Sequence, residues 1–235
     1  MDSEKLSSPG LKEVFVQRLQ GMILSGELLV GSRLPPERTL AEQMQISRTV
    51  VNSGLAELAE QGFLEVRPRQ GTYVADFRSQ GNLDTLTAIM RYKGSALDRE
   101  DIRSVLEARR SLEQLAADRA IRYASDEALE RLGVPLARIA AASGADEAAL
   151  AAFTFRHELA LAGGNTVLPL LFQSFKEPLV TLWTRYCGRY GNLAAVRNTE
   201  TLYSFLKKRD ADGAVCWINA YLERVIGGSQ QVYEP

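Results

Sequence analysis

A serine followed by an arginine and a threonine, Ser47-Arg48-Thr49, opens a stretch whose side chains suit contact with nucleic acid. Serine is a favoured N-cap, so we expect a helix to begin here and to end before Gly62. At helical spacing, apolar and polar residues separate onto two faces: Val51, Leu55 and Leu58 on one, and Thr49, Asn52, Ser53 and Ala56 on the other, with Arg48 on the flank. A small, polar helix face can enter the major groove of DNA and hydrogen-bond base edges.

Charge is distributed unevenly along this predicted helix. Arg48 stands at its start, whereas Glu57 and Glu60 stand at its end. Positive potential can therefore concentrate at the end whose backbone N–H groups also favour phosphate. The whole chain of 235 residues has a formal net charge of -1, so the sequence predicts a local nucleic-acid site within a nearly neutral protein.

The elements around this helix are marked by glycine and proline. Apolar residues at helical spacing predict a first helix from Leu11 to a stop at Ser25-Gly26, and Pro35-Pro36 precede a short helix over residues 37–44. After Gly62, strand-like residues on either side of a turn-rich, cationic tip predict a hairpin over residues 63–74. This order of helices and hairpin is that of a winged helix-turn-helix.

Three ordered motifs in residues 11–74 resemble the DNA-binding domain of the GntR family of bacterial transcription regulators. They are Gly31-x-Arg33-Leu34-Pro35-x-Glu37-x-x-Leu40, Ser47-Arg48-Thr49 and Gly71-Thr72-x-Val74. The resemblance implies that four residues contact DNA: Arg38, Ser47, Arg48 and Thr49. Of these, Arg48 would read a guanine. Arg33 and the hairpin tip, at Arg69 and Gly71, would contact the DNA backbone or the minor groove.

Two positions depart from the family pattern. Asn52 stands where members commonly carry arginine, and it joins the predicted DNA-binding residues with its own side chain. Arg69-Gln70 replaces the more usual glycine-arginine at the hairpin tip. The operator sequence of relatives therefore does not transfer to this chain.

The rest of the chain is predicted to be helical. A polar stretch with Gly81 indicates a linker, which divides the chain into an N-terminal tail (1–10), a winged-helix domain (11–76), a linker (77–82) and a helical domain (83–230). Caps and breaks predict helices over residues 83–92, 98–123, 126–142, 146–162, 166–190, 198–208 and 210–230. The expected fold class is mainly α: a winged helix-turn-helix with a small β hairpin, then an all-helical bundle.

The helical region carries a second resemblance. Its motifs are Leu106-Glu-Ala-Arg-Arg-Ser-Leu-Glu113, Leu159-Ala-Leu-Ala-Gly-Gly-Asn165 and Arg209-Asp-Ala-Asp212, and they are similar to the ligand-sensing domain of the fatty-acid-regulator subfamily. Many relatives hold a divalent metal there through one aspartate and three histidines. His157 matches the first histidine, but Phe153 stands at the aspartate position, and the later positions fall near Thr199 and Tyr221. Since the chain has a single histidine, we expect neither a metal site nor a cofactor.

Aromatic residues and arginines surround the positions of the missing ligands. The candidate effector-binding residues are Arg109, Phe153, His157, Arg185, Tyr186, Arg189, Trp217 and Tyr221. This mixture suits a pocket that holds an apolar tail and pairs an anionic head with arginine. Similarity of residues 182–190 to acyl-CoA-binding members implies a fatty acyl-CoA or related acyl carboxylate, with another small organic acid as the alternative. Aromatic residues at this spacing also suit a plain core, in which case the domain only dimerises.

Other classes of protein fit poorly. No nucleophile elbow or paired catalytic site is apparent, and residues 83–230 are too few for the aminotransferase-like domains that some GntR-type heads carry, so we expect no enzyme and no catalytic residues. Cys187 and Cys216 lack metal-ligand spacing and favour a reducing compartment. Since no signal region follows Met1 and no run approaches the roughly 18 apolar residues of a membrane span, we expect a cytoplasmic protein with no membrane partner.

Together these features predict a homodimeric regulator with two kinds of partner. The winged domain would bind a palindromic double-stranded DNA operator, and the helical domain a small anion. A ligand can act only by preferring one arrangement of the DNA-binding heads, so effector and operator affinities must be reciprocally linked.

Overall fold

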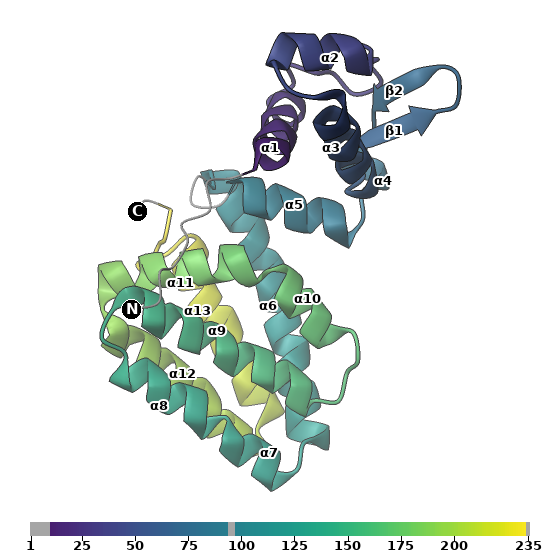
Figure 1. Ribbon diagram of the computed structural model, residues 1–235. Coiled ribbons are helices and arrows are strands. Elements are labelled where there is room, and N and C mark those ends of the chain that lie inside the picture. Colours follow the sequence, from purple (N-terminus) through teal and green to yellow (C-terminus); the bar gives the residue numbers. More distant parts are fainter. Residues whose placement is uncertain (1–9, 94–96, 234–235) are drawn as a thin grey trace, which may run out of the picture. The chain divides into compact units, whose positions relative to one another are not determined.

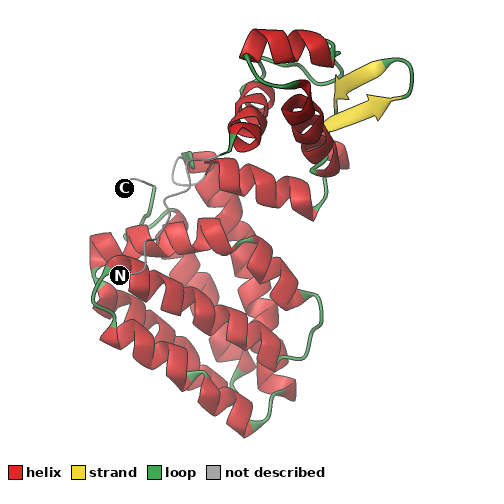
Figure 2. Cartoon of the chain, viewed as in Figure 1, coloured by secondary structure: helices red, strands yellow, loops and turns green. Residues whose placement is uncertain are grey.

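The chain divides into two compact units, Met1–Tyr92 and Lys93–Pro235. The computed structural model describes residues 10–93 and 97–233, so the expected tail, residues 1–10, lies outside the described residues apart from Gly10. Among the described residues, the strands belong to the first unit and the second unit is helical, as Figures 1 and 2 show. The predicted fold class is confirmed.

The first unit has the element order predicted for a winged helix-turn-helix. Its elements are α1 (Leu11–Leu24), α2 (Glu37–Met44), α3 (Arg48–Glu60), β1 (Leu64–Arg67), β2 (Gly71–Val74), α4 (Phe77–Gln80) and α5 (Leu83–Lys93), whose last residue falls in the second unit. Ser47 caps α3 as expected, because its Oγ accepts a hydrogen bond from the Val50 N–H at 3.3 Å. The apolar faces of α1 and α3 meet the hairpin in a core that includes Phe15, Leu58 and Phe63.

The hairpin is extended by a segment that the sequence did not predict to pair. β1 and β2 are antiparallel, with Leu64 opposite Val74 and Arg67 opposite Gly71. Residues 31–34 run along the other edge of β2: the Leu34 N–H donates to the Thr72 carbonyl, and the Val74 N–H to the Ser32 carbonyl, both at 2.9 Å. This pairing fixes the entry to α2 against the wing.

The region expected to be a linker, residues 77–82, is built into the first unit instead. Phe77 of α4 is buried and its ring lies 5.6 Å from that of Phe63. The following helix, α5, also packs here, since Ala88 belongs to the same core. The first unit therefore extends to Tyr92, beyond the boundary that the polar composition suggested, because apolar residues scattered among the polar ones reach its core.

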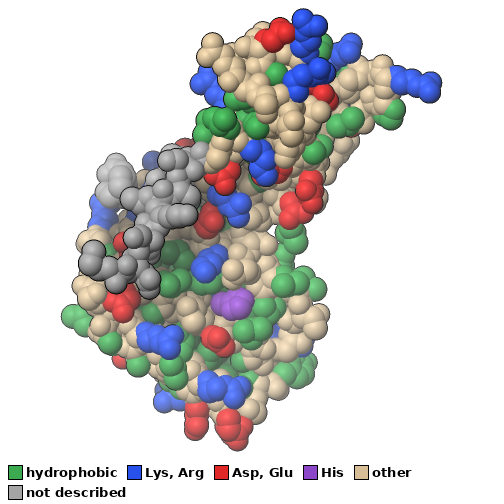
Figure 3. Space-filling view, viewed as in Figure 1, with side chains coloured by type: hydrophobic (Ala, Val, Ile, Leu, Met, Phe, Trp, Pro, Cys, Tyr) green, Lys and Arg blue, Asp and Glu red, His purple; other side chains and the backbone are tan. Residues whose placement is uncertain are grey.

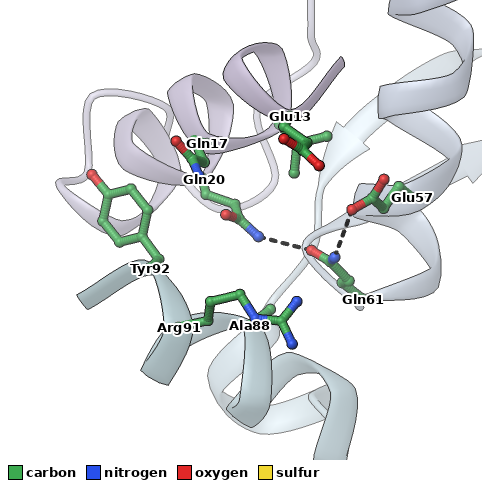
Figure 4. Close-up of a pocket in the computed structure, with 9 residues that line it drawn as sticks. Glu13, Gln17, Gln20, Glu57, Gln61, Ala88, Arg91 and Tyr92 are labelled. Atoms are coloured by element: carbon green, nitrogen blue, oxygen red, sulfur yellow. Dashed lines mark hydrogen bonds between the residues drawn. The ribbon is translucent and has the colours of Figure 1, made fainter. Parts of the chain in front are cut away.

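Close contacts hold α5 against α1 and α3. The Tyr92 hydroxyl packs so closely on Gly21 that a Cβ there would lie 2.5 Å from it. The Thr85 hydroxyl packs in the same way on Gly62, where φ is +77° and a Cβ would lie 2.7 Å from it. Beside these contacts is a cavity of about 430 Å³, in which Gln20 donates to the Gln61 side chain at 2.8 Å (Figure 4). α5 is thus a structural part of the winged-helix unit.

The second unit is a bundle arranged around one helix. Its elements are α6 (Arg99–Tyr123), α7 (Asp126–Arg131), α8 (Gly133–Ala141), α9 (Ala145–Ala162), α10 (Leu168–Ser174), α11 (Lys176–Tyr190), α12 (Asn192–Lys207) and α13 (Ala211–Ile226). The α9 helix packs against α6, α8, α10, α11 and α12, so it lies at the centre. Within the part of the chain that is described, no helix is both long and apolar enough to cross a membrane.

Three helix predictions in this unit differ from the structure. The stretch predicted as one helix at 126–142 is α7 and α8, which meet at Leu132, with Pro135 in the first turn of α8. The stretch predicted at 166–190 is α10 and α11, which meet at Phe175, with Pro178 in the first turn of α11. Proline suits a first helical turn, where no N–H is needed. The helix predicted from Asn198 begins at Asn192, because Gly191 makes the turn at φ +80°.

Arg209 closes the far end of the longest helix. Its Nη1 donates to the carbonyls of Ile121 and Ala124, both at 2.8 Å, at the end of α6. Its Nη2 donates to Asp126 at 2.5 Å. Carbonyls in the last turn of a helix lack partners within the helix, so a guanidinium from a distant segment satisfies them and ties α6 to the turn before α13.

Replacing Arg209 with asparagine should lower the free energy of unfolding by about 2 kcal/mol, since its charge-assisted hydrogen bonds to two carbonyls and to Asp126 are lost. Asparagine tolerates the left-handed backbone at this position, where φ is +56°, so the change isolates the side chain. Urea denaturation measures the loss. The neighbouring Lys208→Ala, at an exposed position, should change stability by less than about 0.5 kcal/mol. Equal stability of the two variants would contradict the capping role.

Candidate functional site

The predicted division of α3 into two faces is confirmed. Val51, Leu55 and Leu58 are buried in the core of the first unit. Arg48, Thr49 and Asn52 are exposed. The serine cap and the buried face together present the start of α3 to solvent, with backbone N–H groups of the first turn beside the Arg48 side chain.

Residues from three separate segments meet at a surface depression of about 330 Å³. It is lined by the approach to α2, the start of α3 and the start of β2: Arg33, Leu34, Pro35, Pro36, Glu37, Arg38, Arg48, Leu55, Gly71 and Thr72. Four of the predicted DNA-binding residues, Arg33, Arg38, Arg48 and Gly71, are therefore neighbours on one surface. Figure 3 shows lysine and arginine side chains over α2 and at the hairpin tip.

The arginines of this surface are held without being buried. Arg38 pairs with Glu42 at 2.9 Å, and both side chains are largely exposed. An exposed pair at this spacing contributes only a few tenths of a kcal/mol, so Arg38 can exchange its partner for a phosphate at little cost. Glu57, which could oppose an approaching phosphate, pairs with Lys12 at 2.8 Å. That contact raises the pKa of Lys12 through a hydrogen bond from its ammonium to the Glu57 carboxylate.

Gly71 shapes the wing for Arg33. Its φ is +118°, and a Cβ there would lie 2.8 Å from Arg33 Nε. The glycine therefore allows both the backbone turn and the close approach of the guanidinium. Arg69 is exposed at the hairpin tip with φ +63°.

Arg67 is a wing arginine that the sequence did not single out. It lies over the Tyr73 ring at 4.4 Å and pairs with Glu65 at 2.9 Å. The hydrogen bond from Arg67 holds the pKa of Glu65 below its usual range. Arg67 therefore braces the hairpin, and the spacing Glu65-x-Arg67 on one predicted strand, which puts both side chains on one face, could have revealed the pair.

The second unit holds a buried ionic cluster of Arg109, Glu113 and Arg156. Glu113 accepts hydrogen bonds from Arg109 Nε at 2.9 Å and from Arg156 Nε at 2.8 Å. Arg156 also donates to Thr199 Oγ1 and Asn198 Oδ1, both at 3.2 Å. The three charged side chains are only 2–3% exposed. The cluster thus joins α6, α9 and α12 through polar contacts inside the bundle.

Charge and aromatic rings set the chemistry of this cluster. Burial works to raise the pKa of Glu113, but the charges of Arg109 and Arg156 outweigh it and hold that pKa below its usual range. Burial lowers the pKa of the Arg156 guanidinium. Both guanidinium groups contact the Trp183 ring, Arg109 at 4.7 Å and Arg156 at 4.4 Å from its centroid, and the ring stacks on Tyr221.

The predicted effector-binding residues are brought together only in part. Arg109, Tyr186 and Tyr221 lie in or beside the cluster, with Trp217 stacked on Tyr221 at 6.5 Å. The Phe153 and His157 rings stack on each other at 6.0 Å on α9, with Phe153 buried. Arg185 reaches towards the Val232 carbonyl at 3.5 Å, and Arg189 lies on the surface over Tyr190.

The sequence did not predict that Glu113 supplies a carboxylate to this cluster. Glu113 stands four residues after Arg109, a spacing that places both on one face of a helix, so the pair could have been inferred. The bridge to Arg156 links positions that are 43 residues apart, and no local pattern indicates it. The predicted arginine site therefore already contains a carboxylate supplied by the chain.

The donor set does not fit the divalent-metal site of relatives. Phe153 has no ligating atom, and among the described residues no group of three or more histidine, cysteine, aspartate or glutamate side chains could hold an ion. The positions near Thr199 and Tyr221 are occupied by side chains that contact Arg156 and Arg109. A metal ion needs anionic or imidazole ligands, and the guanidinium groups in contact with these two side chains are cationic.

A winged helix-turn-helix with an arginine-lined recognition surface, followed by an all-helical domain, defines a class of two-domain DNA-binding regulators. Residues 11–74 match the bacterial regulatory proteins of the gntR family, and residues 104–224 match the FCD domain. The chain belongs to the GntR family of bacterial regulatory proteins, in the branch that carries an FCD domain.

Relatives agree with this assignment, and a solved structure shares the fold. The chain is 39% identical to the regulator Mce2R of Mycobacterium tuberculosis over 112 residues, which span 46% of each chain. It is 32% identical over 161 residues to the fatty acid metabolism regulator protein of Shewanella halifaxensis, covering 68% of this chain and 63% of that protein. The solved structure of Lar from Listeria monocytogenes shares the fold, with a TM-score of 0.65 at 15% identity, over 94% of this chain and 96% of that one.

Replacing Gly71 with alanine should weaken DNA binding about tenfold, because the new Cβ displaces Arg33 from the recognition surface. Backbone strain at φ +118° should also cost about 1 kcal/mol or more of stability. Gly26→Ala is the matched control, since φ there is +80° but nothing lies within 4 Å of the added atom. Fluorescence anisotropy with selected DNA should show the affinity loss for Gly71→Ala alone, and equal affinities would refute the role of Arg33.

Proposed function

We propose that this protein is a homodimeric transcription regulator that binds a palindromic DNA operator and responds to a small anion. The observation that carries the DNA-binding part is the meeting of Arg33, Arg38 and Arg48 on one exposed surface beside the start of α3. Two copies of a recognition helix related by a two-fold axis match the two half-sites of a palindrome.

Each side chain at this surface has a proposed role. Arg48, exposed at the start of α3, reads a guanine through bidentate hydrogen bonds, and Thr49 and Asn52 contact neighbouring base edges from the same helix face. The first turn after Ser47 offers backbone N–H groups to a phosphate, and Arg38 supports it. Arg33 and Arg69 follow the backbone or minor groove from the wing.

The effector proposal rests on the buried guanidinium groups and the aromatic rings beside them. Arg109 and Arg156 can pair with an anionic head, and Trp183, Tyr186 and Tyr221 offer an apolar surface to a tail. The fatty acid metabolism regulator among the relatives favours an acyl-CoA or related acyl carboxylate. The tight burial of the cluster favours a second candidate, a smaller organic acid.

We expect Arg48→Ala to abolish specific operator binding while the fold stays intact, because one bidentate base contact contributes about 1–3 kcal/mol of discrimination and α3 keeps its cap and buried face. An operator obtained by selection from random DNA, followed by footprinting, gives the readout, and circular dichroism checks the fold. Arg18→Ala, an exposed arginine on α1, should protect the operator normally. Normal protection of the operator by Arg48→Ala would refute the assignment of Arg48 as the residue that reads a guanine.

Long-chain acyl-CoA should raise the melting temperature of the protein. It should also change operator affinity by the same factor by which the operator changes acyl-CoA affinity, since the two affinities are linked. Native mass spectrometry of the purified protein identifies any ligand already bound, and thermal shift then compares acyl-CoAs with small organic acids. If acyl-CoAs change neither stability nor operator affinity, the fatty-acyl proposal fails and the DNA-binding proposal survives.

A further inference from the structure

Charged and aromatic side chains share one face of the wing, the hairpin of β1 and β2. Glu65 lies opposite Tyr73, and Arg67 lies opposite Gly71. On its other side, Tyr73 is bridged to Arg33. Residues directly opposite each other on antiparallel strands, and residues two apart on one strand, lie on the same face of a sheet. Arg33 and Arg67 therefore share a face with Glu65.

This face is turned away from the core and adjoins the surface proposed to bind DNA. The opposite face of the hairpin carries Leu64 and Val74, which are buried. The Arg33 guanidinium lies at Gly71, since a Cβ there would be 2.8 Å from Arg33 Nε. Gly71 is the cross-strand partner of Arg67, so the two arginines meet at the same part of β2. Because Arg33 and Gly71 line the depression at the start of α3, Arg67 extends its cationic edge along the wing.

Arg67 is held at this face by two contacts of different kinds. Its guanidinium lies 4.4 Å from the centroid of the Tyr73 ring. Its Nη2 donates to Glu65 Oε2 at 2.9 Å, and among the described residues this guanidinium has no further hydrogen-bond acceptor. A guanidinium offers five N–H donors in a planar fork that fits a phosphate as well as a carboxylate. The aromatic ring can therefore keep Arg67 in place while its anionic partner changes.

The pair of Arg67 with Glu65 adds little to the stability of the hairpin. The two side chains are 42% and 53% exposed, and water screens an ion pair at this level of exposure. The backbone ladder of the hairpin and its pairing with residues 31–34 already fix the strands. Glu65 acts instead on an approaching phosphate, because it carries the same sign of charge and occupies a donor that the phosphate would use.

We propose that Arg67 is a further contact of the wing with the DNA backbone, and that Glu65 is an internal competitor that weakens binding to DNA of any sequence. This inference rests on the proposed DNA-binding function. On DNA, Arg67 donates to a phosphate in place of Glu65, whose carboxylate returns to solvent, and the Tyr73 ring holds the guanidinium. Phosphate contacts carry no sequence information, so Glu65 lowers the affinity for the operator and for unrelated DNA by the same factor. Recognition is thereby left to the base contacts of α3.

The test measures the affinity of the full chain for two duplexes by fluorescence anisotropy over a series of salt concentrations. One duplex is an operator obtained by selection, and the other is unrelated DNA of the same length. Arg67→Gln should weaken binding to both by about fivefold and reduce the slope of log affinity against log salt by about one, because one phosphate contact is lost. Arg18→Gln, at an exposed position on α1, is the charge-matched control. An unchanged slope in Arg67→Gln, or an equal change in the control, would overturn the contact.

The effect of Glu65→Gln should have the opposite sign. This variant should bind both duplexes about two- to fivefold more tightly, since Arg67 no longer has to leave a carboxylate. The gain should disappear in the double variant Glu65→Gln/Arg67→Gln, because competition requires Arg67. Glu60→Gln, at an exposed position at the end of α3, controls for the loss of a negative charge. Weaker binding by both single variants would show that the pair only braces the hairpin, and a gain that persists in the double variant or equals that of Glu60→Gln would likewise contradict competition.

The unmodified protein and Arg48→Ala separate this inference from the proposed function. Arg67 and Glu65 lie at the surface, so their variants should fold, which circular dichroism checks. If the unmodified protein selects no operator, the DNA-binding function and this inference fail together. If operator binding depends on Arg48 but the Arg67 and Glu65 variants bind as the unmodified protein does, only this inference fails.

Discussion

The bond from one carboxylate to two guanidinium groups inside the bundle is the interaction on which the second unit depends. Moving a charged group out of water costs several kcal/mol per ion unless close partners compensate. The cost of burying Glu113 is compensated by hydrogen bonds from Arg109 on its own helix and from Arg156 on α9. Asn198 and Thr199 of α12 accept the remaining hydrogen bonds from Arg156. The positions of three helices are therefore coupled to one hydrogen-bonded group, and a change in the charge of this group alters the packing of the helices.

The first unit differs from the second in that its arginines are exposed and yet must be held in position. A buried face on α3 fixes the helix, and the pairing of residues 31–34 with β2 carries Arg33 to the wing. Weak surface contacts, such as Arg38 with Glu42, hold side chains that can be released to phosphate. Strong local geometry combined with weak side-chain pairing suits a surface that must bind a highly charged partner and let it go.

The sequence predicted those features that are encoded locally. Caps, glycine breaks and apolar periodicity located the helices of the winged unit and the hairpin, because each depends on residues within a few positions of one another. Local signals are weaker at the joints: a proline in the first turn of a helix is compatible with that helix and does not mark where the helix before it ends. The sequence therefore predicts one helix where the structure has α7 and α8, and one where it has α10 and α11. The polar segment 77–82 is predicted as a linker because its one large apolar residue, Phe77, shows its role only where it packs against Phe63.

By itself, the sequence determined the class of this protein and which side chains of α3 face solvent, since residue type and short spacing are sufficient for each. Tertiary structure decided how arginines distant in sequence are used. It placed Arg33, Arg38 and Arg48 on one surface, and it brought Arg156 to Glu113 across 43 residues of chain. Electrostatic contacts depend on distance and burial in space, and neither can be read from the order of residues along the chain.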